Sequence, residues 1–385
     1  MLNLLHWIAI FFLLASAAGI AYLCIAVWRV LTFRQLPAPN GKFTPPVTIL
    51  KPIHGIEPEL YENLASFCDQ EYADFQIVFG VHDANDPALG TIENVIASFP
   101  ERDIALVIGD ASTSGNPKIA NLQRMLGAVK YDLLVIADAD MRVEPRYLRA
   151  VVAPFAQSSV GAVTALYAGV PSGGPYSALA AMFINEQFTP SVLVALTFEQ
   201  LRYCFGSTMA VRRSALDAIG GLDALAPYLA DDYMLGKFIS EHGLTVALAQ
   251  TLIHNVVDEP TFAGLWSHQM RWARTIRASR PFGYAGSFLT FGFSMTLLYL
   301  ATSGNIALGV PLGLVAAALC VALHYAARAS FASEHPATPW LAPARDLLGC
   351  ALWAVSYFGR SVRWRDAKFA VDVAGHVTDE SAQTG

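Results

Sequence analysis

The sequence predicts an α/β domain with a mostly parallel sheet, flanked by transmembrane helices near both ends of the chain. Two observations carry this prediction. Short β-rich segments alternate with helical segments between residues 45 and 255, and long uncharged segments lie before and after that region. Charged residues make up only 15% of the 385 residues and hydrophobic residues 54%, whereas soluble domains usually carry about 25% charge. This deficit argues against a wholly soluble protein and against a disordered chain.

The central alternation contains four strand–helix pairs. Apolar runs predict the strands, and each is followed by a segment with helical periodicity. Consecutive strands joined by helices pair in parallel, and ligands bind beyond the carboxyl ends of such strands. The polar residues at those ends are therefore the candidates for a site. The predicted strands are 47–50, 75–81, 104–108 and 133–137, and the helices that follow them are 57–68, 88–98, 118–129 and 145–155.

Two uncharged segments are long enough to cross a bilayer. Residues 8–27 carry no charge, and about 20 apolar residues span a bilayer. No Lys or Arg precedes this run, which disfavours a cleaved signal peptide. Residues 281–327 contain no Asp, Glu, Lys or Arg and predict two spans joined at Ser303-Gly304-Asn305. A third segment, 347–358, has twelve uncharged residues and fits either a span or an interfacial or re-entrant helix.

Basic residues predict the orientation of the chain. Arg29, Arg34 and Lys42 follow the first apolar run, and no Lys or Arg precedes it. The positive-inside tendency then places residues 30–280 in the cytosol. The expected domains are an N-terminal membrane helix at 1–31, an α/β domain at 45–280 that ends in a basic interfacial helix, a membrane module at 281–360 and a cytosolic tail at 361–385.

Two global properties narrow the classes of partner. The net charge is −6, so no overall basic field exists to bind nucleic acid. The five cysteines are scattered and form no CxxC pair, which argues against a disulfide framework and against a zinc site.

Acidic residues lie where two predicted strands end and one helix begins. Asp138 and Asp140 follow the strand 133–137, where two carboxylates suit one Mg²⁺ or Mn²⁺; a solvated turn is the alternative. Asp83 follows the strand 75–81 and emerges at the same edge if the strands are parallel; capping of the next helix is its alternative. Asp232 starts a helical pattern, where it either complements the helix dipole or serves as a general base.

Basic residues suggest a site for phosphate. Arg271, Arg274, Arg277 and Arg280 recur every three residues just before the membrane hairpin. This stripe suits anchoring at anionic lipid headgroups, or its first residue and His268 bind a diphosphate, and the two hypotheses are compatible. Lys51 and Lys118 lie at expected loop edges, where a lysine either meets phosphate or is solvated.

The order of these residues matches a known signature. Asp83, Asp138-x-Asp140, Asp232 and His268-x-x-Arg271-Trp272 follow the pattern D, D, D, (Q/R)xxRW. The sequence therefore resembles inverting glycosyltransferases of the GT-A fold, and more specifically the ceramide glucosyltransferase family (family 21). It is most similar to the bacterial branch, which includes hopanoid-associated transferases. The resemblance covers about residues 45–280 and the membrane layout, and His268 departs from the Gln or Arg of the signature.

The resemblance implies a membrane enzyme that transfers glucose or N-acetylglucosamine from a UDP-sugar to the hydroxyl of a lipid acceptor, ceramide or hopanoid, giving a β-glycolipid. It implies a multi-pass protein of the bacterial inner membrane with its catalytic domain in the cytosol. Asp140 would ligate a divalent cation with Asp138 beside it, and Asp232 would be the catalytic base. The residues implied to bind the nucleotide sugar are Asp83, Asp138, Lys118, His268, Arg271 and Trp272.

Two alternatives remain at this point. A processive polysaccharide synthase usually has more spans than this chain and Gln at the position of His268. A catalytically inactive membrane scaffold is the other alternative. Four acidic candidates at predicted strand and helix ends argue against it.

Overall fold

The structure, a computed structural model, describes residues 2–33, 43–110, 115–331, 336, 338–359, 361–364, 367–372 and 375–379. Arg34 and Lys42, on which part of the predicted orientation depends, lie outside the described residues. The chain divides into two compact units. The membrane-helix unit comprises Met1–Arg34, Gly169–Glu199 and Asp258–Lys368, and the sheet unit comprises Gln35–Ala168, Gln200–Val257 and Phe369–Gly385. Residues 169–199 and 258–280, expected within one α/β domain, thus group with the membrane helices.

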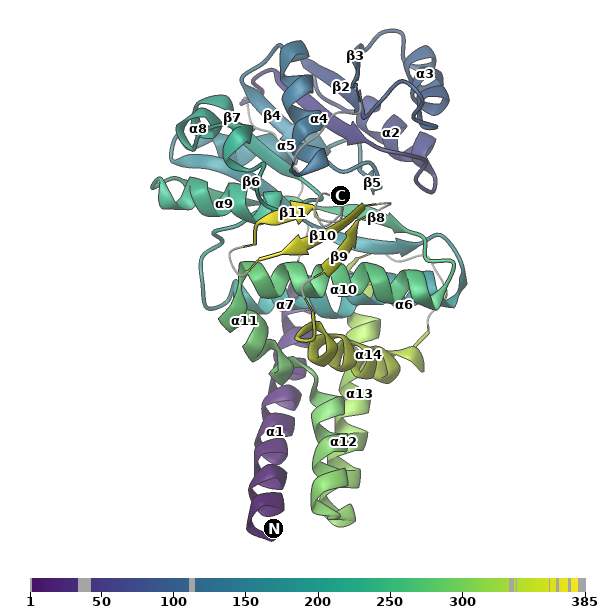
Figure 1. The fold of residues 1–385 in the computed structure, drawn as a ribbon, viewed down its shortest axis with the longest axis vertical. Helices are drawn as coiled ribbons and strands as arrows, with labels where there is room; N and C mark the ends of the chain where they lie inside the picture. Colours follow the sequence, from purple (N-terminus) through teal and green to yellow (C-terminus); the bar gives the residue numbers. More distant parts are fainter. Residues whose placement is uncertain are drawn as a thin grey trace. The chain divides into compact units, whose positions relative to one another are not determined.

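The main sheet has eight strands in the order β3-β2-β1-β4-β7-β6-β8-β5 (Figure 1). The first four strands of this order pair in parallel, as the βα alternation predicts. Strand β7 is antiparallel to β4 and to β6, and β5 is antiparallel to β8, so the sheet is mixed. The strands are β1 Val47–Ile53, β2 Phe75–Val81, β3 Asp103–Ile108, β4 Leu133–Ile136, β5 Met141–Arg142, β6 Val160–Pro171, β7 Met209–Arg212 and β8 Thr245–Val257.

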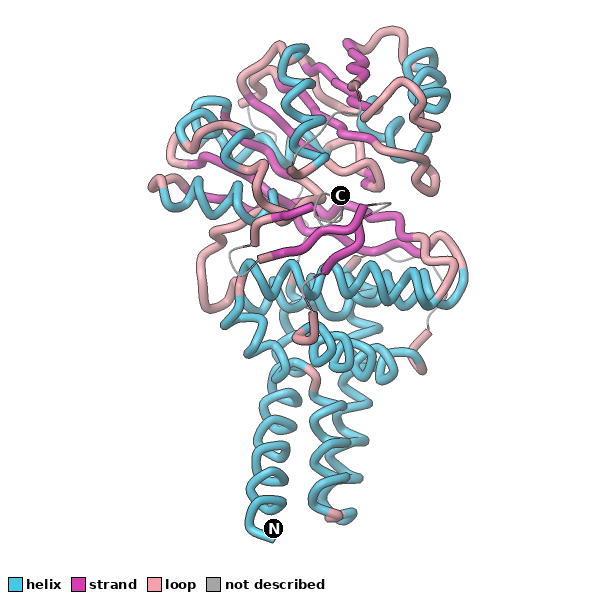
Figure 2. Tube along the Cα trace, in the orientation of Figure 1, coloured by secondary structure: helices cyan, strands magenta, loops and turns pink. Residues whose placement is uncertain are grey.

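Helices follow the first four predicted strands, which confirms the alternation read from the sequence (Figure 2). The four strands begin within one residue of their predicted starts, while β1 runs three residues further than predicted and includes Lys51. The helices of the sheet unit are α2 Leu60–Cys68, α3 Leu89–Ser98, α4 Pro117–Met125, α5 Tyr147–Val152, α8 Arg213–Ala218 and α9 Asp231–Glu241.

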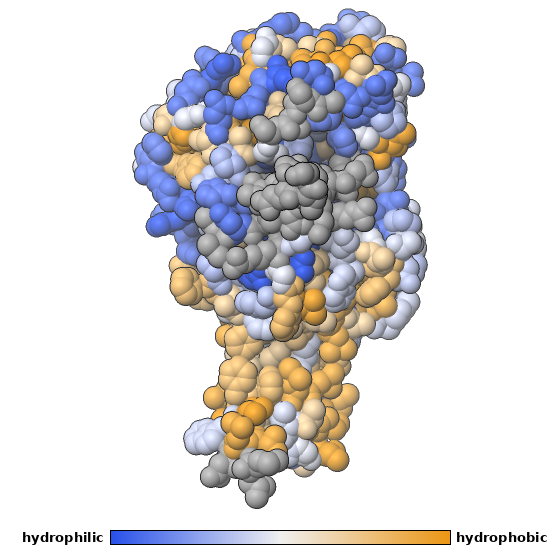
Figure 3. Space-filling view, in the orientation of Figure 1, coloured by the Kyte–Doolittle hydropathy of each residue, from blue (hydrophilic) through white to orange (hydrophobic). Residues whose placement is uncertain are grey.

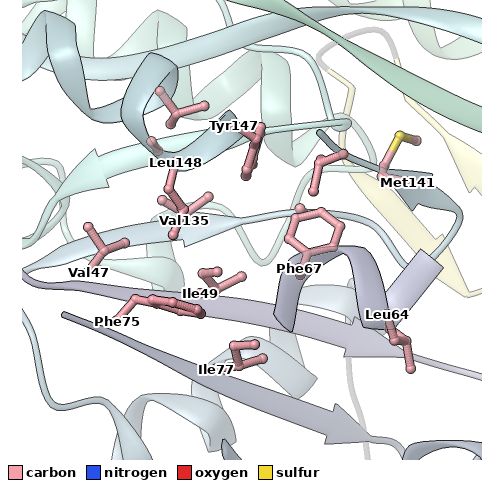
Figure 4. Packing of buried hydrophobic residues seen from close by; sticks show 14 of the residues in the cluster. Val47, Ile49, Leu64, Phe67, Phe75, Ile77, Val135, Met141, Tyr147 and Leu148 are labelled. Carbon is pink, nitrogen blue, oxygen red and sulfur yellow. The ribbon is translucent and has the colours of Figure 1, made fainter. Parts of the chain in front are cut away.

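The core of the sheet unit explains why its central strands are almost continuously apolar. Alternate residues of β1, β2 and β4, such as Ile49, Ile77 and Val135, join a buried cluster with side chains of α2, α3 and α5 (Figure 4). The residues between them, such as Leu50 and Val78, are equally buried on the other face. Strands covered on both faces read as apolar runs rather than as an alternating pattern. This packing fixes the carboxyl edge of the sheet, where the candidate residues lie.

The membrane-helix unit contains helices long and apolar enough to span a bilayer. Among the described residues these are Leu4–Thr32, Gly174–Ala195 and Ile306–Ser330. The predicted hairpin is present, with its turn at Gly304 (φ 63°), but its first arm is broken: Pro281–Thr290 and Gly292–Ser303 meet at 70°. The face shown in Figure 3 is mostly apolar over α1 (Leu2–Thr32) and α12 (Gly292–Ser303), which both contact α13 (Ile306–Ser330).

Gly174–Ala195 was not expected as a candidate span. It comprises α6 (Gly174–Met182), a π-helical segment (Phe183–Phe188) and α7 (Thr189–Ala195). Its charged residue, Glu186, is buried and contacts Nδ1 of His324 at 2.6 Å. A half-buried helix with an internal charge lacks the plain apolar run by which the other spans were recognised.

The third apolar segment forms α14 (Leu341–Ser356), which is not among the spanning candidates. Its two charged residues are buried and satisfied within the unit. Arg345 donates to Oε1 of Gln269 at 2.7 Å and to Oε1 of Gln187 at 2.8 Å, and Asp346 accepts from the Ser294 amide at 2.9 Å. These contacts fit the interfacial or re-entrant alternative. The predicted tail contains the strands β9 (Ser361–Trp364), β10 (Ala367–Val371) and β11 (Val377–Asp379).

Candidate functional site

The carboxyl ends of β1, β2 and β4 meet at one edge of the sheet. Ile53 of β1 pairs with Val81 of β2, and Leu50 of β1 pairs with Ile136 of β4. Asp83 and Asp138 each follow two residues after one of these strands, so both emerge at this edge, as the parallel pairing predicts. Asp83 Oδ1 accepts from the Asn85 amide at 2.7 Å within its own loop.

Lys118 binds two acidic residues from different segments. Its Nζ lies 2.7 Å from Oδ1 of Asp138 and 3.4 Å from Oδ2 of Asp231. The start of α4 explains this position: Asn116 caps the helix by accepting from the Lys118 and Ile119 amides, and Pro117 occupies its first turn. Lys118 is therefore held in the first turn of a fixed helix, pointing at the acidic cluster.

Asn116 also fixes the chain before α9. Its Nδ2 donates to the carbonyl of Tyr228 at 2.9 Å and to Oδ1 of Asp231 at 3.3 Å. Asp231 is buried, whereas Asp232, the next residue, accepts at Oδ1 from the Tyr233 amide at 2.7 Å. The adjacent acidic residues thus have different surroundings: Asp231 joins the Lys118 network, and Asp232 lies at the helix end.

Asp138 and Asp232 converge on Gly206. A Cβ placed on Gly206 would lie 3.1 Å from Oδ2 of Asp138 and 3.3 Å from Oδ2 of Asp232. Both carboxylates therefore approach one point on the backbone of the segment before β7, and glycine leaves that point open. The structure brings together Asp138, Asp232 and Lys118, which the sequence had marked separately.

Asp140 is held by a residue from a distant strand. Its Oδ2 accepts from Nδ2 of Asn255 at 2.8 Å, and its carbonyl accepts from the Val256 amide at 3.0 Å. Lys51 lies beneath the same loop and donates through Nζ to the Asp138 carbonyl at 2.5 Å. Lys51 is fully buried in β1, with its ammonium 3.7 Å from the centre of the Phe67 ring. The expectation that Lys51 lies at a solvated loop edge is therefore wrong.

Burial and crowding of charge shift the acidity of the cluster. Burial, the charge of Asp138 and that of Glu57 raise the pKa of Asp140 to about 7. Burial and the charge of Asp231 raise the pKa of Asp232 to about 6. Burial lowers the pKa of Lys51 to about 7 against the opposing charges of Asp140 and Asp138. An Asp with a pKa near neutrality can exchange a proton during a reaction at ordinary pH.

Asp138 and Asp140 are the carboxylates available to the predicted cation. Among the described residues, no group of three or more His, Cys, Asp and Glu side chains is placed to hold a metal ion. Mg²⁺ is commonly bound by one or two carboxylates, with substrate phosphates and water completing its shell. Asp138 and Asp140 supply two such carboxylates, and the raised pKa of Asp140 reflects in part a repulsion that a cation would relieve. The residues therefore fit Mg²⁺ or Mn²⁺ bound together with a phosphate-bearing substrate.

His268, Arg271 and Trp272 belong to α10 (Phe262–Ser279) of the membrane-helix unit. The His268 ring lies 4.4 Å from the Trp272 ring between centroids, and its Nδ1 lies 2.7 Å from Oε1 of Glu259. Trp272 in turn packs on Phe183, with centroids 5.3 Å apart. His268 and Trp272 thus form one aromatic group on the helix.

The rest of the arginine stripe has protein partners. Arg274 donates to the carbonyls of Phe358 and Ser361, and Arg277 donates to those of Ser356 and Gly359. These carbonyls lie at and beyond the end of α14, where backbone acceptors lack helical partners. Arg280 pairs with Glu199 at 3.1 Å. The expectation that these three arginines serve chiefly to meet lipid headgroups is not supported, because their guanidinium groups bind carbonyls and a carboxylate.

Several site residues were not singled out from the sequence. Gly206 and Asp231 are not among the candidate residues that the sequence predicts. Asn255 and Glu259 carried no local signal, because their roles depend on pairing across the sheet and on packing at the start of α10. A polar residue in a buried strand, as Asn255 is in β8, was the one available hint.

The chain is similar in sequence to ceramide glucosyltransferases. Ceramide glucosyltransferase 1 of Caenorhabditis elegans is 26% identical over 238 residues, which are 62% of this chain and 51% of that protein. The ceramide glucosyltransferase of Komagataella phaffii is 40% identical over 101 residues, 25% of this chain and 20% of that protein. The chain thus spans about half, or less, of the length of these curated relatives.

A solved structure and a family model complete the comparison. The mannosyltransferase PcManGT from Pyrobaculum calidifontis, in complex with GDP-Man and Mn2+, matches with a TM-score of 0.57 and 20% identity, covering 92% of this chain and 99% of that chain. This likeness confirms the predicted GT-A fold class. The model described as "Glycosyl transferase family 21" matches residues 11–377. The chain therefore belongs to glycosyl transferase family 21.

Proposed function

We propose that the protein is a membrane-bound inverting glycosyltransferase. It transfers glucose or N-acetylglucosamine from a UDP-sugar to the hydroxyl of a lipid acceptor, a ceramide or a hopanoid, and forms a β-glycolipid. Three observations support this proposal. The chain belongs to family 21, it is similar to two ceramide glucosyltransferases, and it has helices long and apolar enough to span a bilayer. The protein functions in the bacterial inner membrane, with residues 30–280 in the cytosol, where nucleotide sugars are available. Gly174–Ala195 then does not cross the bilayer, because strands before and after it pair in one sheet.

The donor is bound at the carboxyl edge of the sheet. Asp83 contacts the uracil or ribose, and Asp138 lies beside the ribose and the cation. Lys118, held between Asp138 and Asp231, supplies positive charge for the diphosphate once the donor is bound. Asp140 and Asp138 hold Mg²⁺ or Mn²⁺, as their donor set permits. When bound, the cation neutralises charge that develops on the departing UDP. His268, Arg271 and Trp272 contribute further contacts to the diphosphate and the acceptor.

Asp232 is the catalytic base, and the convergence of Asp138 and Asp232 on Gly206 is the observation that carries this assignment. The ionised Asp232 accepts the proton of the acceptor hydroxyl. The acceptor oxygen forms a bond to the anomeric carbon as the bond from that carbon to the UDP oxygen breaks. This single in-line displacement converts an α-linked donor into a β-glycoside. A carboxylate with a raised pKa near 6 is ionised at neutral pH and basic enough to take the proton.

The test is a product assay with purified protein in detergent or lipid nanodiscs. UDP-glucose, UDP-galactose and UDP-N-acetylglucosamine are each offered with ceramide, diacylglycerol and a hopanoid polyol. Products are identified by mass, and the anomeric configuration by NMR. A β-linked glycolipid from one donor–acceptor pair is expected. Hydrolysis alone, a polymer, or an α-linked product would contradict the proposal.

The same assay tests the cation. EDTA should abolish transfer, and added Mn²⁺ or Mg²⁺ should restore it. An Asp140→Ala variant should not recover at cation concentrations that restore the wild type. Full activity in EDTA would contradict the role of the cation. It would not bear on the role of Asp232, which is tested separately.

A further inference from the structure

The helix that carries Asp232 begins without a side-chain cap. Helix α9 starts at Asp231, and Ala230 before it has no side-chain oxygen to accept from the amides of the first turn. The position of Asp232 therefore depends in large part on how the sheet unit holds the preceding segment, residues 225–230. Tyr228 is the residue of this segment with the most contacts to other elements described below.

Tyr228 joins two helices of the sheet unit. Its carbonyl accepts from Nδ2 of Asn116, the residue that caps α4, at 2.9 Å. The Asn116 amide donates to the Ala226 carbonyl at 3.1 Å, so Asn116 binds the same segment twice. The Tyr228 ring packs edge-on against the ring of Phe238 in α9, with 5.9 Å between centroids. A displacement of Tyr228 would therefore be passed on to α9.

The end of the chain holds Tyr228 from a further direction. His376 forms an isolated antiparallel bridge with Tyr228, and their rings lie 4.8 Å apart between centroids. The Leu229 amide donates to the Gly375 carbonyl at 3.4 Å. Both segments belong to the sheet unit. The region predicted as a tail thus contacts the segment that leads into the proposed base.

The contacting residues of the tail are themselves fixed. The His376 amide donates to Oδ1 of Asp372 at 2.9 Å, and Nδ1 of His376 lies 3.0 Å from Oδ2 of the same residue. The Asp372 amide donates to the His376 carbonyl at 3.1 Å. Gly375 has a φ of 88°, which glycine adopts without strain. Asp372, Gly375 and His376, here named the C-terminal turn, therefore present the imidazole ring to Tyr228 in a defined place.

We propose that Tyr228 is a positioning residue for Asp232 and that the C-terminal turn keeps Tyr228 in place. This inference rests on the proposed function, in which Asp232 is the base. Tyr228 acts through the start of α9 and needs no contact with the substrate. A base must lie within hydrogen-bond reach of the proton that it removes, and small displacements at a reacting centre slow the reaction. The end of the chain is then part of the catalytic apparatus.

A double-mutant cycle tests this role. His376→Ala, Tyr228→Ala and the double variant are compared for kcat and for KM toward the UDP-sugar. His376→Ala should lower kcat about fivefold to fiftyfold, less than the 10²-fold cost of a full 1 Å misplacement. KM should stay within about twofold, because the residues that bind the donor are unchanged. In the Tyr228→Ala background the same change should cost less than about twofold, because the ring contact is already lost.

Two further variants separate positioning from other roles. Tyr228→Phe keeps the ring and the carbonyl, so kcat should stay within about twofold of the wild type. Tyr61→Ala, which removes an exposed tyrosine of α2 in the same unit, is the matched control and should also keep kcat. A loss in Tyr228→Phe as large as in Tyr228→Ala would overturn the inference, because the hydroxyl group would then act directly. Equal costs of His376→Ala in both backgrounds would overturn it as well.

Hydrogen exchange measured by mass spectrometry tests the contact without turnover. In His376→Ala, peptides that cover residues 226–233 should exchange at least about threefold faster than in the wild type, because local opening becomes easier. Peptides of β2 (Phe75–Val81) should be unchanged. Unchanged exchange over residues 226–233 would overturn the inference. A wild type that shows this difference but transfers no sugar from any UDP-sugar would instead contradict the proposed function.

Discussion

Asp232 is the side chain whose removal tests the proposed chemistry most directly. Asp232→Asn keeps the shape and the acceptor oxygen that meets the Tyr233 amide, but the amide cannot accept the hydroxyl proton. We expect kcat to fall by about 10²- to 10⁴-fold, the usual contribution of a general base. Thermal unfolding in detergent should stay close to the wild type, because the hydrogen bond from the Tyr233 amide is kept.

Asp217→Asn is the matched control for that substitution. Asp217 is an exposed carboxylate of α8 in the same unit, so its loss should leave kcat within about twofold, as for surface changes away from special features. Full activity of Asp232→Asn, measured as product formed per minute, would remove Asp232 from the mechanism.

The dependence of kcat/KM on pH follows from the ionisation of Asp232. Burial and the charge of Asp231 raise the pKa of Asp232 to about 6, and the base functions only when ionised. As the pH falls through about 6, Asp232 becomes protonated, and kcat/KM should decrease by about tenfold per pH unit. The measurement is kcat/KM from pH 4.5 to 8 at saturating cation. A flat profile down to pH 5 would show that no group with this pKa limits the reaction.

Gly206 tests whether the convergence of carboxylates matters. A methyl group at Gly206 would lie 3.1 Å from Asp138 and 3.3 Å from Asp232, so both must shift by a few tenths of an ångström. Small misplacements at a reacting centre are costly, and about 1 Å costs as much as 10²-fold in rate. Gly206→Ala should therefore reduce kcat by about tenfold or more with little change in unfolding temperature. Gly90→Ala, whose Cβ meets nothing within 4 Å, is the control. Equal activity of the two variants would contradict the prediction.

At the scale of elements, the membrane helices pack through glycine. A Cβ on Gly19 of α1 would lie 2.4 Å from Cα of Gly292, where α12 begins, so the two backbones touch. Small residues permit such close approach between helices in a bilayer. Gly19→Val should force α1 and α12 apart and destabilise the protein by at least about 1–3 kcal/mol, the cost of overpacking.

Thermal unfolding of the detergent-solubilised protein measures that cost. Gly313→Ala, on α13, is the control, because its Cβ would meet only a Thr296 methyl at 3.8 Å. A Gly19→Val variant that unfolds at the wild-type temperature would show that the Gly19–Gly292 approach does not support the fold.

The same scale shows what the sequence could and could not predict. Both ends of strand β2 were predicted correctly, because a buried apolar run bounded by turn residues is a local signal. The break between Pro281–Thr290 and Gly292–Ser303 and the π-helical segment at Phe183–Phe188 were not predicted, because neither changes the apolar pattern. The partners of Arg274 and Arg277 were also missed. Periodicity reveals a basic face, but only tertiary packing decides whether carbonyls or lipids meet it.

The sequence predicts which residues belong to the site, but not which other residues they contact. Asp83, Asp138 and Asp232 were found because strand ends and helix starts are visible in sequence. The residues that contact them were not predicted. Asn255 binds Asp140 from a position 115 residues away in the sequence, and Asp231 forms an ion pair with Lys118. Such pairings arise when a mixed sheet brings β8 beside β5, and no local pattern encodes that register.

For the molecule as a whole, the basic residues at helix ends predict which side of the membrane each helix end faces. Arg29 lies in the last turn of α1, and Arg328 lies in the last turn of α13. Basic residues favour the cytosolic side, so both helices should end there. Helix α13, at 25 residues, is about 37 Å long at 1.5 Å per residue and exceeds a hydrocarbon core of about 30 Å. The turn at residues 303–305 should then face outward.

Cysteine labelling distinguishes the two sides in intact cells. Glu101 and Ser303 are both exposed, so each is replaced by Cys in a background in which the five native cysteines are Ser and transfer activity is retained. A membrane-impermeant maleimide should label Ser303→Cys in intact cells, and Glu101→Cys only after the membrane is permeabilised. Labelling of Glu101→Cys in intact cells would reverse the orientation and separate the proposed site from cytosolic nucleotide sugars. Labelling of neither position until permeabilisation would show that the segment before α13 does not cross the bilayer.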